Sequence, residues 1–437
     1  MIFWLQRTIY LHLPAFKSRN FRLFFSGQTM SLSGTFMTQV TISWLIYDLT
    51  KSAWLLGLTG FLQFIPTLLL TPFSGVLCDR LPAGALRHRW NQRNLLMLVQ
   101  VLGIIVSFTL TTLTFLGLVN FWLLMIVAIL GGLLKGLDMP VRYAIVIQTV
   151  DNRDDLGNAI ALYSAMLSSS LLIGPAIGGM LLATVGAKYC FLYDSLSYVV
   201  ALVTLAAMRL KPNLTSDIPQ TNNTWQKLQE GFSYVYKALP IRVILLLLTL
   251  HGLAGASYMA ILPIFAADIL KGDGGTMGLL SAASSVGSLL ACVYLSLRRQ
   301  VLGLERVMAL CPATIGIGLI AFGLSGQIWL SLLILVVIGG GSMLQVSCGN
   351  TIIQTLVEDD KRGRVMSLYS LAVIGTLPLG NLMVGSLAQN IGASYTVMGC
   401  GIVCLFEAIW FTRQLPILTK WIKLKTTSSN QLLNSTT

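Results

Sequence analysis

Long apolar runs with almost no charge dominate this chain and constrain what it can fold into. Leu95–Trp122, Val243–Asp268 and Met308–Ile338 each exceed the roughly 20 residues that a helix needs to cross a bilayer. Charged residues make up only 10% of the 437 residues, whereas a soluble domain carries roughly 25%. The chain is therefore expected to be an all-α membrane protein.

The apolar runs divide into twelve expected spans, and the basic residues between them indicate the orientation. The spans lie near 21–48, 52–78, 94–117, 121–141, 157–184, 187–209, 241–268, 275–297, 303–324, 328–353, 364–389 and 392–413. Of the 29 Lys and Arg, 25 fall in loops on the N-terminal side, three fall on the other side, and Lys135 lies inside the fourth span. The positive-inside rule therefore predicts that both termini lie in the cytoplasm. The chain is expected in the inner (plasma) membrane of the cell. The net charge of +13 then marks topology and contacts anionic membrane lipid, and no nucleic-acid partner is expected.

One block of the sequence occurs twice, in the same direction. The copies are Ile147–Thr149 with Leu162–Ser164, and, 206 residues later, Ile353–Thr355 with Leu368–Ser370. The first spans repeat at an offset of 220, as in Asp48 and Asp268 or Lys51 and Lys271. The difference places 14 extra residues between positions 79 and 93. Duplicated halves in membrane predict two six-helix bundles, related by a pseudo-twofold axis along the membrane normal.

Five regions follow from the spans and the repeat. They are a cytoplasmic N-terminus (1–20), an N-terminal six-helix bundle (21–209), a cytoplasmic linker (210–240), a C-terminal six-helix bundle (241–413) and a cytoplasmic tail (414–437). Trp225, Leu228, Phe232 and Val235 stand at helical spacing, which predicts an amphipathic helix in the linker. The polar end of the tail, after Lys425, is expected to be disordered.

Patterns of catalytic chemistry are missing from the sequence. It contains no hydrolase elbow, Walker loop, HExxH or paired-carboxylate pattern, so an enzyme is not expected. The seven cysteines are scattered without metal-ligand spacing, and no metal or cofactor is expected. Without a nucleotide site, any transport would draw its energy from a gradient of an ion or a solute.

Two motifs resemble those of a known family. Gly75, Asp79 and Arg80, at the end of the second span, resemble the cytoplasmic gate motif between spans 2 and 3 of the major facilitator superfamily. The second motif, in the fifth span, is similar to the C-terminal part of the motif typical of antiporters in that superfamily. Its residues are Gly174, Pro175, Gly178 and Gly179.

A longer stretch resembles one branch of this superfamily. It runs from Asp138 to the glycines of the fifth span and continues with Trp225–Phe232. The branch comprises the enterobactin-exporter-like and macrolide-efflux-like proteins, also called transmembrane secretion effectors. The resemblance implies the major facilitator fold and proton-driven, alternating-access export of a small molecule such as a siderophore, drug or metabolite. A monomer is expected. The alternatives are a phospholipid or lysolipid translocator of the same fold, and a non-transporting membrane sensor or scaffold.

Charged residues inside spans are candidates for coupling, because each is costly in hydrocarbon. Lys135 and Asp138 are three residues apart on one face of the fourth span and can pair. Either Asp138 carries the proton, with Lys135 tuning it, or the two form a structural ion pair near the inner end of the helix. His251, in the seventh span, is a further coupling candidate. Asp194 and Glu407 lie in the sixth and twelfth spans, where internal pairing or hydrogen bonding is the expected role.

The cavity of this fold is expected between spans 1, 4, 7 and 10. Those spans offer apolar, aromatic and amide groups, which suit an amphipathic organic molecule better than a sugar. The candidates are Gln28, Gln39, Trp44, His251, Tyr258, Met259, Met343 and Gln345.

Overall fold

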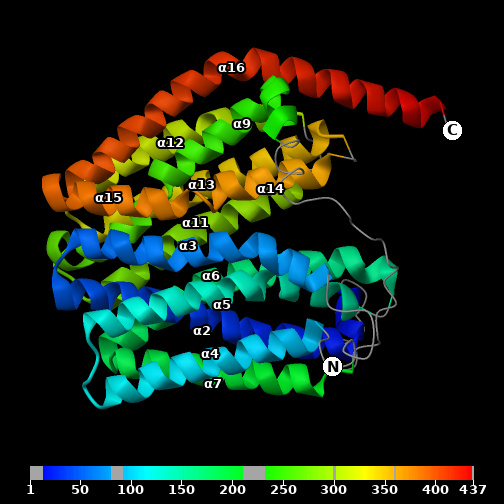
Figure 1. Ribbon diagram of the computed structural model, residues 1–437. Coiled ribbons are helices and arrows are strands. Elements are labelled where there is room, and N and C mark those ends of the chain that lie inside the picture. Colours follow the sequence, from blue (N-terminus) through cyan, green and yellow to red (C-terminus); the bar gives the residue numbers. More distant parts are fainter. Residues whose placement is uncertain are drawn as a thin grey trace, which may run out of the picture. The chain divides into compact units, whose positions relative to one another are not determined.

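A computed structural model gives the structure of the chain and describes residues 13–79, 92–150, 152–209, 232–298, 302–358 and 361–435. Every regular element in these ranges is helical (Figure 1). The chain forms two compact units. Unit 1 comprises 1–51, 62–216 and 272–282, and unit 2 comprises 52–61, 217–271 and 283–437. The first residues of the helix Ala53–Asp79 therefore belong to unit 2, and the first residues of Gly274–Leu297 belong to unit 1.

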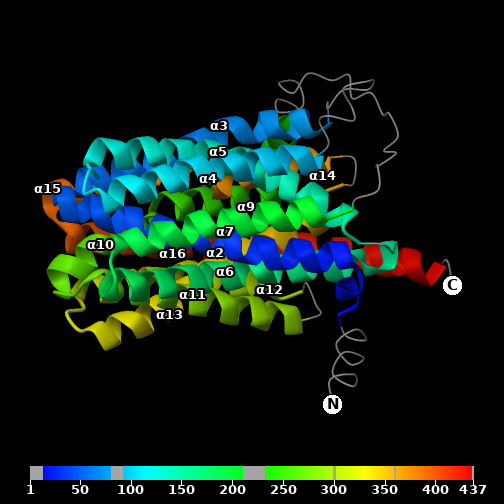
Figure 2. The same cartoon turned by 90° about the horizontal axis from the view of Figure 1, so that it is seen from below.

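Unit 1 is built on the first six long helices. They are α2 (Arg19–Thr50), α3 (Ala53–Asp79), α4 (Gln92–Phe115), α5 (Phe121–Gln148), α6 (Leu156–Thr184) and α7 (Ala187–Ala207), with the short helices η1 (Pro14–Lys17) and η2 (Arg153–Asp155). Helix α2 packs against α5, α6 and α7, and α4 packs against α5 and α7, so these helices run side by side in both ribbon views (Figures 1 and 2). Their shared core includes Phe21, Phe24, Leu96 and Ile145.

Unit 2 contains more helices, several of which are short. They are α9 (Leu239–Leu250), η3 (His251–Gly255), η4 (Ser257–Ile261), α10 (Leu262–Ile264), η5 (Phe265–Ile269), α11 (Gly274–Leu297), α12 (Leu304–Leu324), α13 (Ile328–Leu356), α14 (Arg362–Val373), α15 (Leu377–Ile391) and α16 (Ala393–Ser435). Residues of α9, α12, α13, α14 and α16 form a buried core in this unit. The seventh span is irregular, since η3 and η5 are π-helical and η4 is a 3₁₀ segment. The eleventh span is interrupted between α14 and α15.

Eleven stretches in the described part of the chain are long and apolar enough to cross a membrane. The remaining expected span, 21–48, lies in α2, a helix of 32 residues. Serines, threonines and glutamines recur along α2 and lower its hydropathy. Three of these polar residues, Thr35, Thr38 and Gln39, line the cavity described below.

Backbone geometry repeats along with the sequence. Lys51 and Lys271 have φ angles of 48° and 50°, in the left-handed region that side chains other than glycine rarely adopt. Gly186 and Gly392, the corresponding residues before the last helix of each half, have φ angles of 87° and 89°. The duplicated blocks therefore form the same chain reversals at equivalent positions.

Two expectations, for the linker and for the tail, differ from the structure or lie partly outside it. The expectation of a disordered tail end was wrong, because α16 continues to Ser435. After Pro416 the sequence has no glycine or proline that would stop the helix. Trp225 and Leu228 lie outside the described residues. Residues 232–237 are helical, with Phe232 exposed and Val235 buried in the core of unit 2.

Candidate functional site

Helix α5 has two faces that pack differently, and together they position its charged residues. On one face, a Cβ added to Gly132 would lie 2.2 Å from the carbonyl oxygen of Gln63 in α3. The Thr67 hydroxyl of α3 donates to the Gly132 carbonyl oxygen at 2.8 Å. Glycine at this position thus lets α3 and α5 approach closely. The adjacent face, which carries Lys135, Asp138 and Arg142, lines a cavity.

The cavity lies inside unit 1 and has a volume of about 110 Å³. It is enclosed by α2, α4, α5, α6 and α7, together with Gln63 of α3. Apolar side chains such as Leu32, Val99 and Leu134 form most of its wall. A mostly apolar wall with a few polar groups is typical of sites for small organic molecules.

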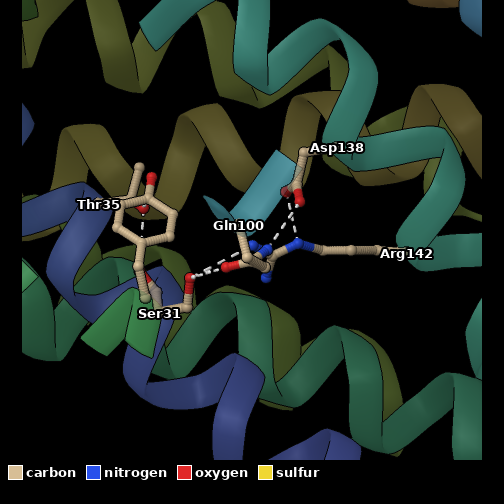
Figure 3. A network of polar contacts seen from close by, with 6 residues as sticks. Ser31, Thr35, Gln100, Asp138 and Arg142 are labelled. Atoms are coloured by element: carbon tan, nitrogen blue, oxygen red, sulfur yellow. Dashed lines mark hydrogen bonds and ion pairs between the residues drawn. The ribbon is translucent and has the colours of Figure 1, made fainter. Parts of the chain in front are cut away.

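Asp138 and Arg142 form an ion pair one turn apart on α5. Their side chains are 13% and 3% exposed. The Gln100 side chain of α4 donates to Asp138 at 3.4 Å, and its amide oxygen accepts from the Ser31 hydroxyl of α2 at 3.3 Å (Figure 3). Arg142 also donates to the Ser31 hydroxyl, at 3.5 Å. Three helices thus meet in a closed polar network around the buried charge pair.

The partner of Asp138 differs from the one expected. The expected pair was Lys135 with Asp138, but the ion pair in the structure joins Asp138 to Arg142. Arg142 was assigned to a cytoplasmic loop because the fourth span was ended at 141. The helix instead continues to Gln148, so Arg142 is a buried helical residue. Spacing of four residues between Asp138 and Arg142 was the signal that could have revealed the pair.

Lys135 has aromatic neighbours instead. Its ammonium lies 5.5 Å from the ring centroid of Phe36 in α2 and 5.6 Å from that of Phe64 in α3. Both distances fit cation–π interactions. Asp138 remains an electrostatic neighbour, but within the described ranges no carboxylate forms an ion pair with Lys135.

A second carboxylate, Asp194 of α7, also lines the cavity. It is 3% exposed and accepts a hydrogen bond from the Ser107 hydroxyl of α4 at 2.8 Å. Hydrogen bonding was the role expected for this residue, and the structure confirms it. Glu407 of α16 differs: it is equally buried, yet neither carboxylate oxygen has a hydrogen-bond partner in the described part of the chain, so the expectation for Glu407 was wrong.

The antiporter-like motif lies at close helix contacts. A Cβ on Gly174 would stand 2.7 Å from the carbonyl oxygen of Ser33, and one on Gly178 would stand 2.6 Å from the Met37 side chain, both in α2. Gly179 approaches the start of α11 within unit 1. Pro175 lies buried inside α6. The motif therefore fixes α6 against its neighbours.

The gate motif is only partly within the described structure. Gly75 and Asp79 belong to the last turns of α3, while Arg80 and the insertion up to residue 91 lie outside the described residues. The interactions of this motif stay a prediction.

The remaining cavity candidates are distributed over both units. In unit 1, Gln39 lines the cavity, whereas Gln28 is fully buried outside it and Trp44 is half-buried away from it. The candidates in unit 2 are His251, Tyr258, Met259, Met343 and Gln345. His251 is 4% exposed in the π-helical η3, and the Tyr258 hydroxyl lies 3.3 Å from that of Ser284. The Gln345 amide is buried without a partner among the described residues.

Comparison with known proteins decides the family. The model of the family described as transmembrane secretion effector matches residues 12–435. The chain belongs to this family. Its members are transporters of the major facilitator superfamily, and the chain is accordingly a multi-pass membrane transporter rather than an enzyme.

Individual relatives agree with this assignment. The chain is 23% identical to the staphyloferrin A transporter of Staphylococcus aureus, over 94% of this chain and 98% of the relative. It is 22% identical to macrolide efflux protein A of Streptococcus pyogenes, over 89% of this chain and 96% of the relative. The crystal structure of the nucleoside transporter NupG matches with a TM-score of 0.67 at 12% identity, over 90% of this chain and 98% of that chain. At that identity the structural likeness shows the fold alone.

Proposed function

We propose that this transporter exports a small amphipathic organic molecule in exchange for protons, by alternating access. The family and the efflux proteins among its relatives support the direction of transport. A siderophore, a drug or a related metabolite is the proposed cargo class. Because the unit 1 cavity combines apolar walls with amide, hydroxyl and charged groups, it suits a cargo with an apolar body and a polar end.

The observation that carries the proton step is the buried Asp138–Arg142 pair facing the cavity. A proton that binds Asp138 neutralises the carboxylate and abolishes its attraction to Arg142. Arg142 keeps its charge, because the guanidinium does not lose its proton in proteins. The protonated and unprotonated states therefore differ in the net charge beside the cavity, and such a difference can favour one conformation over the other.

The orientation follows from the distribution of basic residues. In the proposal both termini lie in the cytoplasm, the chain sits in the bacterial plasma membrane, and anionic lipid contacts its basic loops. One chain suffices for transport in this proposal, because each unit buries its own core.

Uptake by everted membrane vesicles tests the function. Export from a cell becomes uptake into such a vesicle, and an acidic interior supplies the proton gradient. A macrolide and staphyloferrin A, chosen from the names of the relatives, head a panel of amphipathic compounds. We expect at least one compound to accumulate, to release protons outward as it does so, and to leak back when an ionophore collapses the gradient.

A matched pair of substitutions assigns the coupling residue. Asp138→Asn should abolish gradient-driven accumulation. Asp48→Asn, at an exposed ion pair with Lys51, should leave accumulation unchanged. Accumulation that persists in Asp138→Asn would remove this carboxylate from the mechanism, and accumulation that ignores the proton gradient would contradict proton exchange.

A further inference from the structure

Among the charged residues that line the cavity, Lys135 is the one with neither an ion pair nor a hydrogen bond in the described part of the chain. It stands near the middle of α5, where a charge is costly in a membrane. The carboxylate nearest in sequence, Asp138, is occupied by Arg142 and Gln100. No oxygen accepts a hydrogen bond from the Lys135 ammonium anywhere in the ranges that the structure describes.

The rings of Phe36 and Phe64 hold the ammonium without consuming its hydrogen-bonding capacity. Each ring attracts the cation through its negative face, at 5.5 and 5.6 Å. An ammonium has three N–H donors, and the face of a ring does not replace a negatively charged hydrogen-bond acceptor. The arrangement keeps a cation at the cavity with its donors available.

Two side-chain amides at the same cavity also have hydrogen-bond donors that could bind an anion. Gln39 of α2 and Gln63 of α3 both line it, and neither side chain makes a hydrogen bond within the described part of the chain. Each amide offers N–H donors that suit an anionic oxygen. Gln63 directly precedes Phe64, and Gln39 lies one turn after Phe36, so the amides and the rings come from the same helical segments.

We propose that Lys135, flanked by Phe36 and Phe64 and assisted by Gln39 and Gln63, binds a carboxylate group of the cargo. The exported molecule is then an organic acid, whose carbon skeleton lies against apolar wall residues such as Val99 and Leu134. This inference rests on the proposed export function and narrows its substrate class. It gives Lys135 a role in recognition, separate from the proton step at Asp138.

The charges at the site favour this choice over a cationic cargo. The charged side chains of the cavity are two basic ones, Lys135 and Arg142, and two acidic ones, Asp138 and Asp194. Asp138 is paired with Arg142 and Asp194 accepts a hydrogen bond from Ser107 on α4, which leaves the Lys135 ammonium without either kind of contact in the described part of the chain. A cationic cargo would meet the unpaired ammonium of Lys135 and be repelled, whereas an anion would gain a charge-assisted hydrogen bond.

Binding to the full-length protein in nanodiscs tests the inference without requiring transport. The probes are matched triplets, namely 2-naphthoate, indole-3-acetate and 4-phenylbutyrate, each with its primary amide and its primary amine. We expect the acids to bind roughly 10- to 100-fold more tightly than their amides, the ratio expected for one hydrogen bond to a charged group. The amines should bind more weakly than the amides.

Three variants assign the effect to the ammonium. Lys135→Met should remove the preference for acids, and Lys135→Arg should retain part of it. The matched control is Lys188→Met, because Lys188 also lies beside two aromatic rings, Phe115 and Tyr189, but is exposed and outside the cavity. Circular dichroism and gel filtration establish that each variant is folded.

The outcomes separate this inference from the proposed function. Acids that bind no better than their amides, or a preference that survives in folded Lys135→Met, would overturn the carboxylate site. Tighter binding of a lysophospholipid than of any acid would also overturn it. If acids bind through Lys135 but no compound in the vesicle panel is driven by the proton gradient, the site stands and the export proposal fails.

Discussion

Replacing Asp138 in the Asp138–Arg142 pair should destabilise unit 1 more than replacing Arg142. Both side chains are buried, at 13% and 3% exposure. Their other contacts, to Gln100 at 3.4 Å and Ser31 at 3.5 Å, are at the long limit of hydrogen bonding and replace little of the lost attraction. Asp138→Asn leaves a guanidinium that cannot lose its charge, and we expect a loss of about 3–5 kcal/mol in the free energy of unfolding.

The reciprocal change should cost less. In Arg142→Gln the orphaned carboxyl of Asp138 can become neutral by binding a proton, which limits the loss to about 1–3 kcal/mol, the cost of an unsatisfied buried polar group. The double substitution Asp138→Asn with Arg142→Gln pairs two neutral amides. It should be more stable than the sum of the single losses predicts, by at least about 1 kcal/mol.

Unfolding of the purified protein, followed by circular dichroism during titration with sodium dodecyl sulfate, measures these differences. Asp48→Asn is the matched control, because the Asp48 and Lys51 side chains are more than half exposed, at 55% and 59%, and exposed pairs contribute about 0–1 kcal/mol. The reasoning is refuted if Asp138→Asn is no more destabilising than Asp48→Asn, or if the two single losses simply add.

Two further perturbations test the packing and the second carboxylate. Gly174→Val would place its Cβ against the α2 backbone, at 2.7 Å, and should lower the free energy of unfolding by at least about 1–3 kcal/mol. Gel filtration should show this as a lower yield of folded protein. Gly157→Ala, with nothing within 4 Å of the added Cβ, should be tolerated, and equal yields of the two variants would contradict the contact. Ser107→Ala removes the hydrogen bond to Asp194 and should lower the free energy of unfolding by about 1–3 kcal/mol. Ser164→Ala, at an exposed position, should change the free energy of unfolding little. If the two variants lose the same amount, the hydrogen bond contributes nothing to stability.

Local and periodic features of this fold could be predicted from the sequence. The duplicated blocks indicated two equivalent halves, and Lys51 and Lys271 indeed share a left-handed conformation. The glycines of the antiporter-like motif could be recognised in the sequence, and Gly174 and Gly178 pack closely against α2. Such features depend on neighbours within one helix or on the space that a glycine leaves.

The partners in the site could not be predicted in the same way. Arg142 was counted among the loop charges, because a basic residue at the end of an apolar run is usually cytoplasmic. Its burial depends on Asp138 and on contacts from α2 and α4. The rings beside Lys135 come from α2 and α3, roughly 100 and 70 residues earlier in the chain, and nothing local in the sequence specifies which rings meet a given lysine.

The most direct test of the central claim compares two modes of transport in the same proteoliposomes. The first is accumulation of the cargo against its gradient, driven by an imposed pH difference. The second is exchange of labelled for unlabelled cargo with no pH difference. Asp138→Asn should abolish the first and retain the second, because the protein still binds and moves cargo but no longer couples it to protons. If the variant retains gradient-driven accumulation, or loses exchange as well while folded, Asp138 is not the coupling residue.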